Sequence, residues 1–207
     1  MSGDLDFLSP SLARDEGGFH PVARSAAERL FRAVDATFAE RDGWLVPIRV
    51  PGEADHLDRV GISDLSHLGT LDVRPAPPAD LEGDGVTTYR LSPRRALVVY
   101  PQSARTAVGE QVAAEALVID MTAAFTVLGL TGPDARALVS RLTHLHRFPA
   151  GGEVAHVTAH VLPAGAGYRV MVAQELGHYV AEVALDCAIA LGGGLVGVDA
   201  LPREEAR

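Results

Sequence analysis

The sequence predicts an α+β fold whose sheets are mainly antiparallel, and three observations support this prediction. Alternating apolar segments flank short turns at residues 92–94 and 163–167, as in β-hairpins. Helices are not expected after every strand, so the alternation typical of a parallel sheet is not followed. Finally, the order strand, helix or its remnant, hairpin, helix occurs twice along the chain.

A short motif marks the start of each half. Asp64-Leu65-Ser66 and Asp120-Met121-Thr122 each place a hydroxyl two residues after an aspartate, ahead of an alternating apolar segment. Self-similarity on this scale predicts a duplicated supersecondary unit. The expected divisions are an extended arm, one domain and, inside it, two repeats, at residues 1–24, 25–202, 61–116 and 117–190.

The first elements are predicted from spacing and punctuation. Apolar residues at helical intervals, with Ser25 as the cap, predict a helix over residues 25–40 that Asp42-Gly43 ends. Residues 44–50 are expected to form a short strand, in which Pro47 indicates either an edge position or a bulge. The next elements expected are a helical turn, a strand, a hairpin and a helix, at residues 55–60, 68–73, 85–91 with 95–100, and 104–116.

Prolines and glycines delimit the later elements. The prolines of residues 74–80 forbid a regular helix there, whereas Pro133 suits the first turn of one. The glycines at 192–194 follow a helix and are expected to cap it. The second half is predicted to contain a strand, a helix, a hairpin, a helix and a last strand, at residues 124–130, 132–142, 154–162 with 167–173, 176–190 and 195–198.

Composition excludes several classes of function. The net charge is −9 and the chain has no lysine, which argues against binding to a nucleic-acid backbone. The N-terminal residues lack the pattern of a signal peptide, and no apolar run reaches the roughly 18 residues of a membrane span. The single cysteine, Cys187, is expected on the buried side of a helix and fits a reducing compartment. We therefore expect a cytoplasmic protein without a membrane segment.

Asp64, Ser66 and His67 are the first candidate catalytic residues. Their side chains are those of a catalytic triad, but triad members normally converge from separate elements. A structural interpretation is that Asp64 and Ser66 bind the backbone of a turn, and that Asp120 and Thr122 do the same in the second half. The alternative is contact with a ligand near the axis that relates the two repeats.

Two histidine pairs and several arginines are further candidates. His144 with His146, and His156 with His160, would each share a face of a strand, but neither pair has a carboxylate at a familiar spacing. We therefore expect no metal site. The arginines flank one hairpin and a later helix and are expected on solvated faces, in ion pairs with a partner or in an anion pocket, at positions 90, 94, 95, 136, 141 and 147.

Two sets of motifs resemble known families. The segments at residues 38–48, with Gly43-Trp44-Leu-Val-Pro47, and 61–69, with Asp64-Leu-Ser-His67, resemble the folate-binding domain of the glycine-cleavage T-protein, an aminomethyltransferase. Leu-Thr-Gly-Pro-Asp-Ala at 130–135 and Glu-Leu-Gly-His-Tyr-Val at 175–180 resemble the gamma subunit of heterotetrameric sarcosine oxidase. The resemblance covers roughly residues 25–202, with gaps.

The resemblance implies a folate-binding-domain fold without the C-terminal barrel of the T-protein. It implies a non-catalytic accessory subunit in an amine-oxidising or one-carbon-transfer assembly, whose larger partner subunits carry flavins. The alternatives are a stand-alone tetrahydrofolate-dependent enzyme with a site rebuilt around Asp64, Ser66, His67 and Tyr89, and a small-molecule-binding or regulatory module.

One departure from the family concerns the cofactor site. In the T-protein a glutamate of a glycine-rich loop contacts the pterin, and Gly165 stands at that position here. A glycine cannot accept the paired hydrogen bonds of an aminopyrimidine edge. The resemblance leaves Tyr89, Tyr168 and Arg95 as the candidates for binding tetrahydrofolate.

Overall fold

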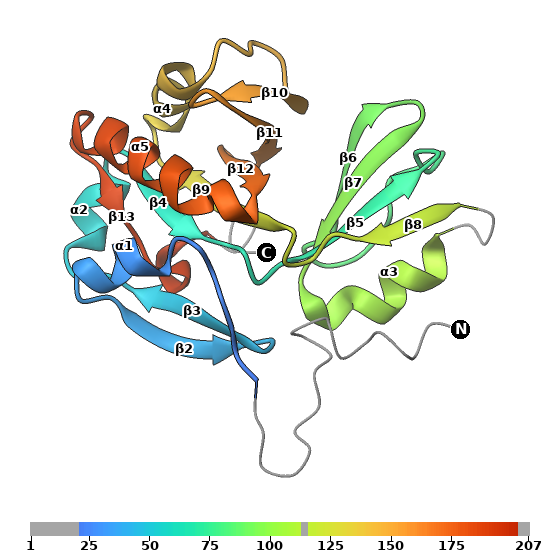
Figure 1. Cartoon of the computed structure of the whole chain (residues 1–207), viewed down its shortest axis with the longest axis horizontal. Helices are drawn as coiled ribbons and strands as arrows, with labels where there is room; N and C mark the ends of the chain where they lie inside the picture. Colours follow the sequence, from blue (N-terminus) through green and yellow to red (C-terminus); the bar gives the residue numbers. More distant parts are fainter. Residues whose placement is uncertain (1–20, 113–115, 203–207) are drawn as a thin grey trace.

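The computed structural model describes residues 21–112 and 116–202. Within these residues the strands form a three-stranded, a six-stranded and a four-stranded sheet, and neighbouring strands are mostly antiparallel. In Figure 1 the three-stranded and six-stranded sheets lie on one side with most of the helices. The four-stranded sheet lies on the other side with α3. The predicted α+β class is confirmed. The residues of the predicted arm at 1–20 and of the tail at 203–207 lie outside the described part.

The three-stranded sheet has the order β1-β3-β2, and helix α1 lies between β1 and β2 in the sequence. Its elements are β1 (Ala23–Arg24), α1 (Glu28–Ala33), β2 (Thr37–Arg41) and β3 (Trp44–Arg49). The predicted helix over residues 25–40 is therefore wrong in its second half. Asp35 adopts a left-handed φ of 55°, and the Ala36 N–H bonds back to the Phe31 carbonyl. This Schellman-type cap ends the helix and frees the next residues to form a strand.

Pro47 illustrates how this sheet tolerates a missing donor. β3 is the central strand, so the predicted edge position is wrong. The register of β2 instead shifts between Thr37 and Phe38, and Phe38 faces Pro47 across the irregularity, as the bulge alternative predicted. On the other side, the pairing of β3 with β1 ends at Leu45, so no β1 carbonyl lies opposite Pro47.

The six-stranded sheet carries the largest hydrophobic core. Its order is β10-β11-β12-β9-β4-β13, with only the pair β4–β13 parallel. Helices α4 and α5 pack on one face, with α1 beside them. The strands and helices are β4 (Gly61–Asp64), β9 (Phe125–Thr131), α4 (Ala135–Leu142), β10 (Ala150–Val154), β11 (Val157–Ala164), β12 (Gly167–Ala173), α5 (Gly177–Ile189) and β13 (Gly194–Leu195).

The four-stranded sheet has the order β6-β7-β5-β8, and α3 covers one of its faces (Figure 1). Its elements are β5 (Gly69–Arg74), β6 (Thr87–Ser92), β7 (Arg95–Tyr100), α3 (Arg105–Gln111) and β8 (Leu117–Asp120). Outside the sheets lie α2 (Glu53–Leu57) and 3-10 turns at Gln102–Ala104, Gln174–Leu176 and Val198–Ala200. No helix among the described residues is both long and apolar enough to cross a membrane.

The two larger sheets exchange strands. β4 directly precedes β5 in the chain but pairs with β9 in the six-stranded sheet. In the same way β8 directly precedes β9 but pairs with β5 in the four-stranded sheet. The two connections, residues 65–68 and 121–124, therefore cross between the sheets at one place. This crossing positions the candidate site.

Candidate functional site

The turn after β4 is closed by the side chains of the predicted motif. Oδ1 of Asp64 accepts a hydrogen bond from the Ser66 N–H at 3.1 Å and another from the Ser66 hydroxyl at 2.6 Å. The Ser66 oxygen in turn accepts the Val127 N–H of β9 at 3.1 Å and lies 3.3 Å from the Ser25 hydroxyl. The structural interpretation of Asp64 and Ser66 is confirmed, because both side chains bind backbone groups of the crossing.

The turn after β8 repeats the two bonds that are accepted from backbone N–H groups. Oδ1 of Asp120 accepts the Thr122 N–H at 2.9 Å, and the Thr122 hydroxyl oxygen accepts the Thr70 N–H of β5 at 3.0 Å. The backbone bonds are reciprocal as well, from Leu65 N–H to the Val127 carbonyl and from Met121 N–H to the Thr70 carbonyl, each at 2.8 Å. Each turn thus binds a strand that belongs to the other half of the chain.

Ser66 does not have the geometry of an activated nucleophile. A hydroxyl donates one hydrogen bond, and that of Ser66 goes to Asp64. In a triad the hydroxyl is instead bonded to the histidine that takes its proton. The three residues are close in space, yet their bonds fix the turn and do not link serine to histidine.

Burial also shapes the ionisation of Asp64 and His67. Burial raises the pKa of the Asp64 carboxyl, and the nearby hydroxyls of Ser25 and Ser66 offset part of that rise. Burial, together with the positive charges of Arg41 and Arg169, lowers the pKa of His67 to about 4. The imidazole of His67 is therefore neutral near pH 7.

Three buried polar atoms in this cluster have no hydrogen-bond partner. They are Oδ2 of Asp64, Nδ1 of His67 and Nε1 of Trp44. All three residues line one small space that also touches Ser25 and Ser66 and admits no water-sized sphere. A buried acceptor and two buried ring nitrogens without partners are unusual, because such groups normally find partners or ordered water.

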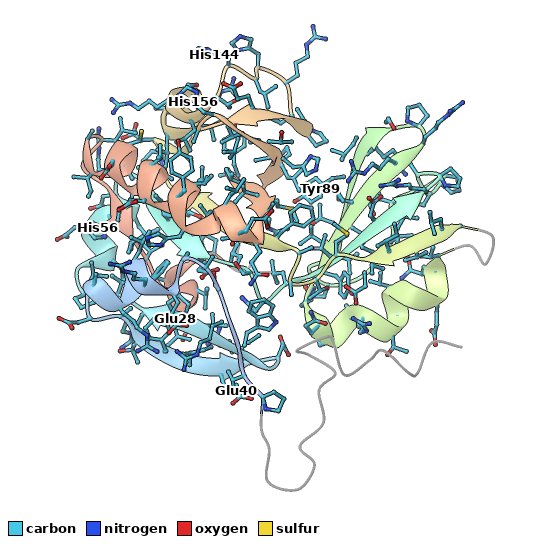
Figure 2. The ribbon with its side chains drawn as sticks, viewed as in Figure 1. Glu28, Glu40, His56, Tyr89, His144 and His156 are labelled. Carbon is cyan, nitrogen blue, oxygen red and sulfur yellow. The ribbon has the colours of Figure 1, made fainter. Side chains whose placement is uncertain are left out.

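A buried arginine, which sequence reasoning missed, joins the two lobes of the molecule, one built on the six-stranded sheet and the other on the four-stranded sheet. Arg169 of β12 is only 1% exposed, and its Nη1 donates to the Tyr89 hydroxyl at 3.2 Å. Tyr89 of β6 donates in turn to the Pro163 carbonyl at 2.8 Å. Figure 2 shows Tyr89 between the two larger sheets. The available signal was the two-residue period of a strand, which places Arg169 on the same face as the buried Met171.

The other two candidates for cofactor binding lie apart from this cluster. Tyr168 is on the opposite face of β12 from Arg169 and packs edge-on against Phe148, with ring centroids 5.4 Å apart. Arg95 donates to the buried carboxylate of Asp72 at 3.1 Å, beside Arg74. Burial acts to raise the pKa of Asp72, but these two guanidiniums outweigh it and hold the pKa below its usual range. Of these three candidates, Tyr89 is the one whose side chain bonds to the buried Arg169.

The histidine pairs are spread over the surface and the space between the lobes. His156 is exposed and lies 3.4 Å from Glu153, while burial and the charge of Arg95 lower the pKa of the half-buried His160. A hollow of about 410 Å³ lies beside His144 and His156, far from Tyr89 in Figure 2. In the described ranges no three or more His, Cys, Asp or Glu side chains are grouped as metal ligands.

The fold is similar to two solved structures. The glycine cleavage system aminomethyltransferase T from Bartonella henselae matches 86% of this chain with a TM-score of 0.67 and 19% identity. This chain spans 60% of that protein's length. A chain of the heterotetrameric sarcosine oxidase from Corynebacterium sp. U-96, in complex with pyrrole 2-carboxylate, matches 84% of this chain with a TM-score of 0.59 and 15% identity, over 99% of its own length. No family model and no curated protein matches the sequence.

These similarities establish the fold. The chain folds like aminomethyltransferase T, as the sequence motifs predicted, and a chain of a heterotetrameric sarcosine oxidase has a similar fold. At identities of 19% and 15%, residue roles do not transfer with the fold.

Proposed function

We propose that the chain is a non-catalytic accessory subunit of a multisubunit assembly that oxidises amines or transfers one-carbon units. The observation that carries this proposal is the use of the motif's polar groups. The Asp64 Oδ1 and the Ser66 hydroxyl form hydrogen bonds within the crossing between the sheets. Asp120 and Thr122 form similar bonds to backbone N–H groups, without a histidine beside them. A feature found in both halves is explained by architecture.

The sarcosine oxidase similarity supports the same proposal. It extends over 99% of one chain of a heterotetramer, so a unit of this size and fold serves as a whole subunit elsewhere. In the proposed assembly the larger partners carry the flavin and the folate site. Gly165 fits that division, because it offers no side chain where the T-protein has its pterin-contacting glutamate.

A second candidate function is tetrahydrofolate-dependent one-carbon transfer by this chain itself. It is favoured by the unpartnered buried atoms of Asp64, His67 and Trp44, which a polar ligand would satisfy. The space beside them is closed, so this function requires β3 or the turn after β4 to move.

Purification of the tagged chain from its native host tests the first proposal. We expect it to be isolated with larger flavoprotein subunits in fixed stoichiometry, identified by mass spectrometry and by flavin absorbance. Isolation as a monomer would contradict the proposal. Adding tetrahydrofolate to the isolated chain then tests the second candidate, since a bound ligand raises the melting temperature with concentration. His67→Gln is the control, because a site at the cluster would lose this shift.

A further inference from the structure

A hollow of about 410 Å³ lies where the end of α4 meets the turn between β10 and β11. Its volume is within the range of small-molecule sites. Residues 140–145, that turn and Val183 of α5 line it, and its histidines lie away from Tyr89 (Figure 2). None of these residues belongs to the crossing between the sheets or to the cluster around Asp64. The hollow is therefore a separate candidate site.

Hydrogen bonds hold two walls of the hollow together. The Ala155 N–H donates to the Leu142 carbonyl at 2.8 Å, and the Thr143 hydroxyl donates to the Glu153 carbonyl at 2.5 Å. The Thr143 oxygen also accepts the Leu145 N–H at 3.2 Å, which fixes the segment after α4. Because these bonds form within the chain alone, the hollow does not depend on a ligand for its shape.

The turn between β10 and β11 is formed without glycine. Val154 faces Val157, so Ala155 and His156 are the two residues of the turn, and their φ angles are left-handed, at 48° and 66°. Turns of this kind normally use asparagine, aspartate or glycine, because other side chains disfavour a positive φ. Residues held in unfavourable conformations cluster at functional sites. The turn therefore favours a functional role for the hollow beside it.

The floor of the hollow is apolar and its surroundings are polar. Leu142 and Ala155 are only 6% and 8% exposed, and the partly buried Leu145 and Val183 pack against the same core. The other lining residues are polar, and most of them are exposed. A ligand with an apolar body would remove apolar surface from water here, which is favourable.

The polar lining has more available donors than acceptors. The side chains of Arg141 and His144 form no hydrogen bond or ion pair within the described residues. Glu153, the acid among the lining residues, already lies 3.4 Å from His156. A guanidinium offers five N–H donors in a planar fork, and an imidazole offers at least one. A group that brings acceptors, such as a carboxylate, therefore complements the hollow.

The position of Arg141 at the end of a helix does not by itself engage its guanidinium. A positive charge in the last turn of α4 is favourable, because the end of a helix carries partial negative charge. The Val139 and Leu142 carbonyls of that turn, however, already accept the backbone N–H groups of Thr143 and Ala155. The guanidinium therefore remains available to a ligand.

Two further acids are near the hollow in sequence but do not line it. Glu182 and Asp186 flank Val183 on α5, and both are exposed. Because water and salt screen exposed charges, these acids weaken the attraction of an anion to Arg141 without removing it.

We propose that this hollow binds a small carboxylate with an apolar body. The carboxylate bonds to Arg141, whose planar fork suits it, and to His144. The body lies on Leu142, Leu145 and Ala155. The hollow is complete in this chain, so the inference does not depend on the accessory-subunit function proposed above and adds ligand binding to it.

Titration of the isolated chain with benzoate tests the proposal, and benzamide is the matched neutral probe. Both have the same shape and apolar ring, but only benzoate carries a carboxylate. NMR shifts of the His144 and Ala155 backbone amides, measured at constant ionic strength, report binding. We expect benzoate to bind at least about tenfold more tightly than benzamide. Equal binding overturns the role of the carboxylate, and the absence of saturable shifts with benzoate overturns the site.

Two arginines of α4 provide matched variants. Arg141→Gln removes the charge that lines the hollow, whereas Arg136→Gln removes the same charge from a side chain that stacks 5.0 Å from the ring centroid of Phe148. We expect the first to weaken benzoate binding at least about tenfold and the second less than about twofold. Equal weakening would show that benzoate responds to net charge alone, and it overturns the proposal.

Ser140 keeps the test independent of arginine. It is exposed and lines the hollow, so Ser140→Asp and Ser140→Asn both preserve the fold and differ by one negative charge. We expect Ser140→Asp to bind benzoate at least about threefold more weakly than Ser140→Asn. Equal affinities, or the reverse order, overturn the placement of the carboxylate. Failure of these titrations leaves the accessory-subunit function standing, and isolation of the chain as a monomer leaves this site standing.

Discussion

The turns after β4 and β8 share the hydrogen bonds that their side chains accept from backbone N–H groups, in different surroundings. Asp64 is 2% exposed and bonds the Ser66 backbone and hydroxyl, whereas the side chain of Asp120 is 32% exposed and forms an ion pair with Arg105. His67 follows Ser66, and Ala123, with a left-handed φ of 69°, follows Thr122. The comparison shows that Asp64 and Ser66, although their side chains are of catalytic types, form one of two similar Asp–hydroxyl turns. In this turn burial has shifted the pKa of Asp64 and of the neighbouring His67.

The largest contrast is expected between the two aspartates. Asp64→Ala removes two hydrogen bonds to a carboxylate and leaves a buried N–H unpaired, at a cost of about 3 to 4 kcal/mol. Asp120→Ala removes one backbone bond and a partly exposed ion pair, at a cost of about 1 kcal/mol. Urea unfolding of both variants measures the difference. Equal losses would show that the two turns do not differ in this way.

The next effect concerns pH and belongs to the β4 turn alone. His67 has a folded pKa of about 4 against an ordinary 6.5, so between these values the unfolded chain binds more protons than the folded one. The contribution of neutral His67 to the free energy of unfolding should therefore be complete above pH 6.5. The free energy of unfolding should fall by about 3 kcal/mol as the pH drops to 4. Unfolding of His67→Gln over this range should show a flatter dependence. An unchanged slope would remove His67 as its source.

The hydroxyls should differ less than the aspartates. Ser66→Ala leaves the buried Val127 N–H without a partner and removes one of the two hydrogen bonds to the Asp64 carboxyl, and we expect a loss of about 2 kcal/mol. Thr122→Val keeps the shape of the residue but leaves the Thr70 N–H unpaired in the more exposed turn, for about 1 kcal/mol. Thermal unfolding measures both. Thr122→Val as the costlier variant would contradict the order given by burial.

The smallest effect is expected at the second link between the lobes. Tyr89→Phe loses the bonds to the Pro163 carbonyl and from Arg169, and should cost about 1 kcal/mol. Tyr168→Phe is the control, since that ring faces the other side of β12. If Tyr89→Phe costs more than Ser66→Ala, the lobes are held together by this link more than by the crossing.

Local pattern explains which features the sequence predicted. Both hairpins, the long helices α4 and α5 and the Asp–hydroxyl turns follow from residues close together in the chain. The cap at Gly192 was predicted for the same reason, and the Gly193 N–H bonds to the Ala188 carbonyl as expected of it. These features depend on periodicity and on the conformational freedom of single residues.

The remaining features depend on contacts between distant segments. The exchange of β4 and β8 between sheets is not encoded in either short strand, because the motif is the same whichever sheet receives it. β10 was missed because Ala-Gly-Gly-Glu-Val lacks alternation and gains its order from pairing with β11. Arg169 was missed because an arginine in a strand is normally solvated, and only the two-lobed arrangement buries it.

The central proposal is that the Asp64–Ser66–His67 group supports the fold and performs no chemistry. The most direct measurement is the turnover of an amine substrate by the purified assembly containing the His67→Gln chain, with native mass spectrometry confirming that the assembly is intact. The account predicts a rate within about twofold of wild type, because a buried imidazole without a catalytic contact carries no step. A loss of about a hundredfold or more in an intact assembly would be the signature of general acid–base catalysis and would contradict the account.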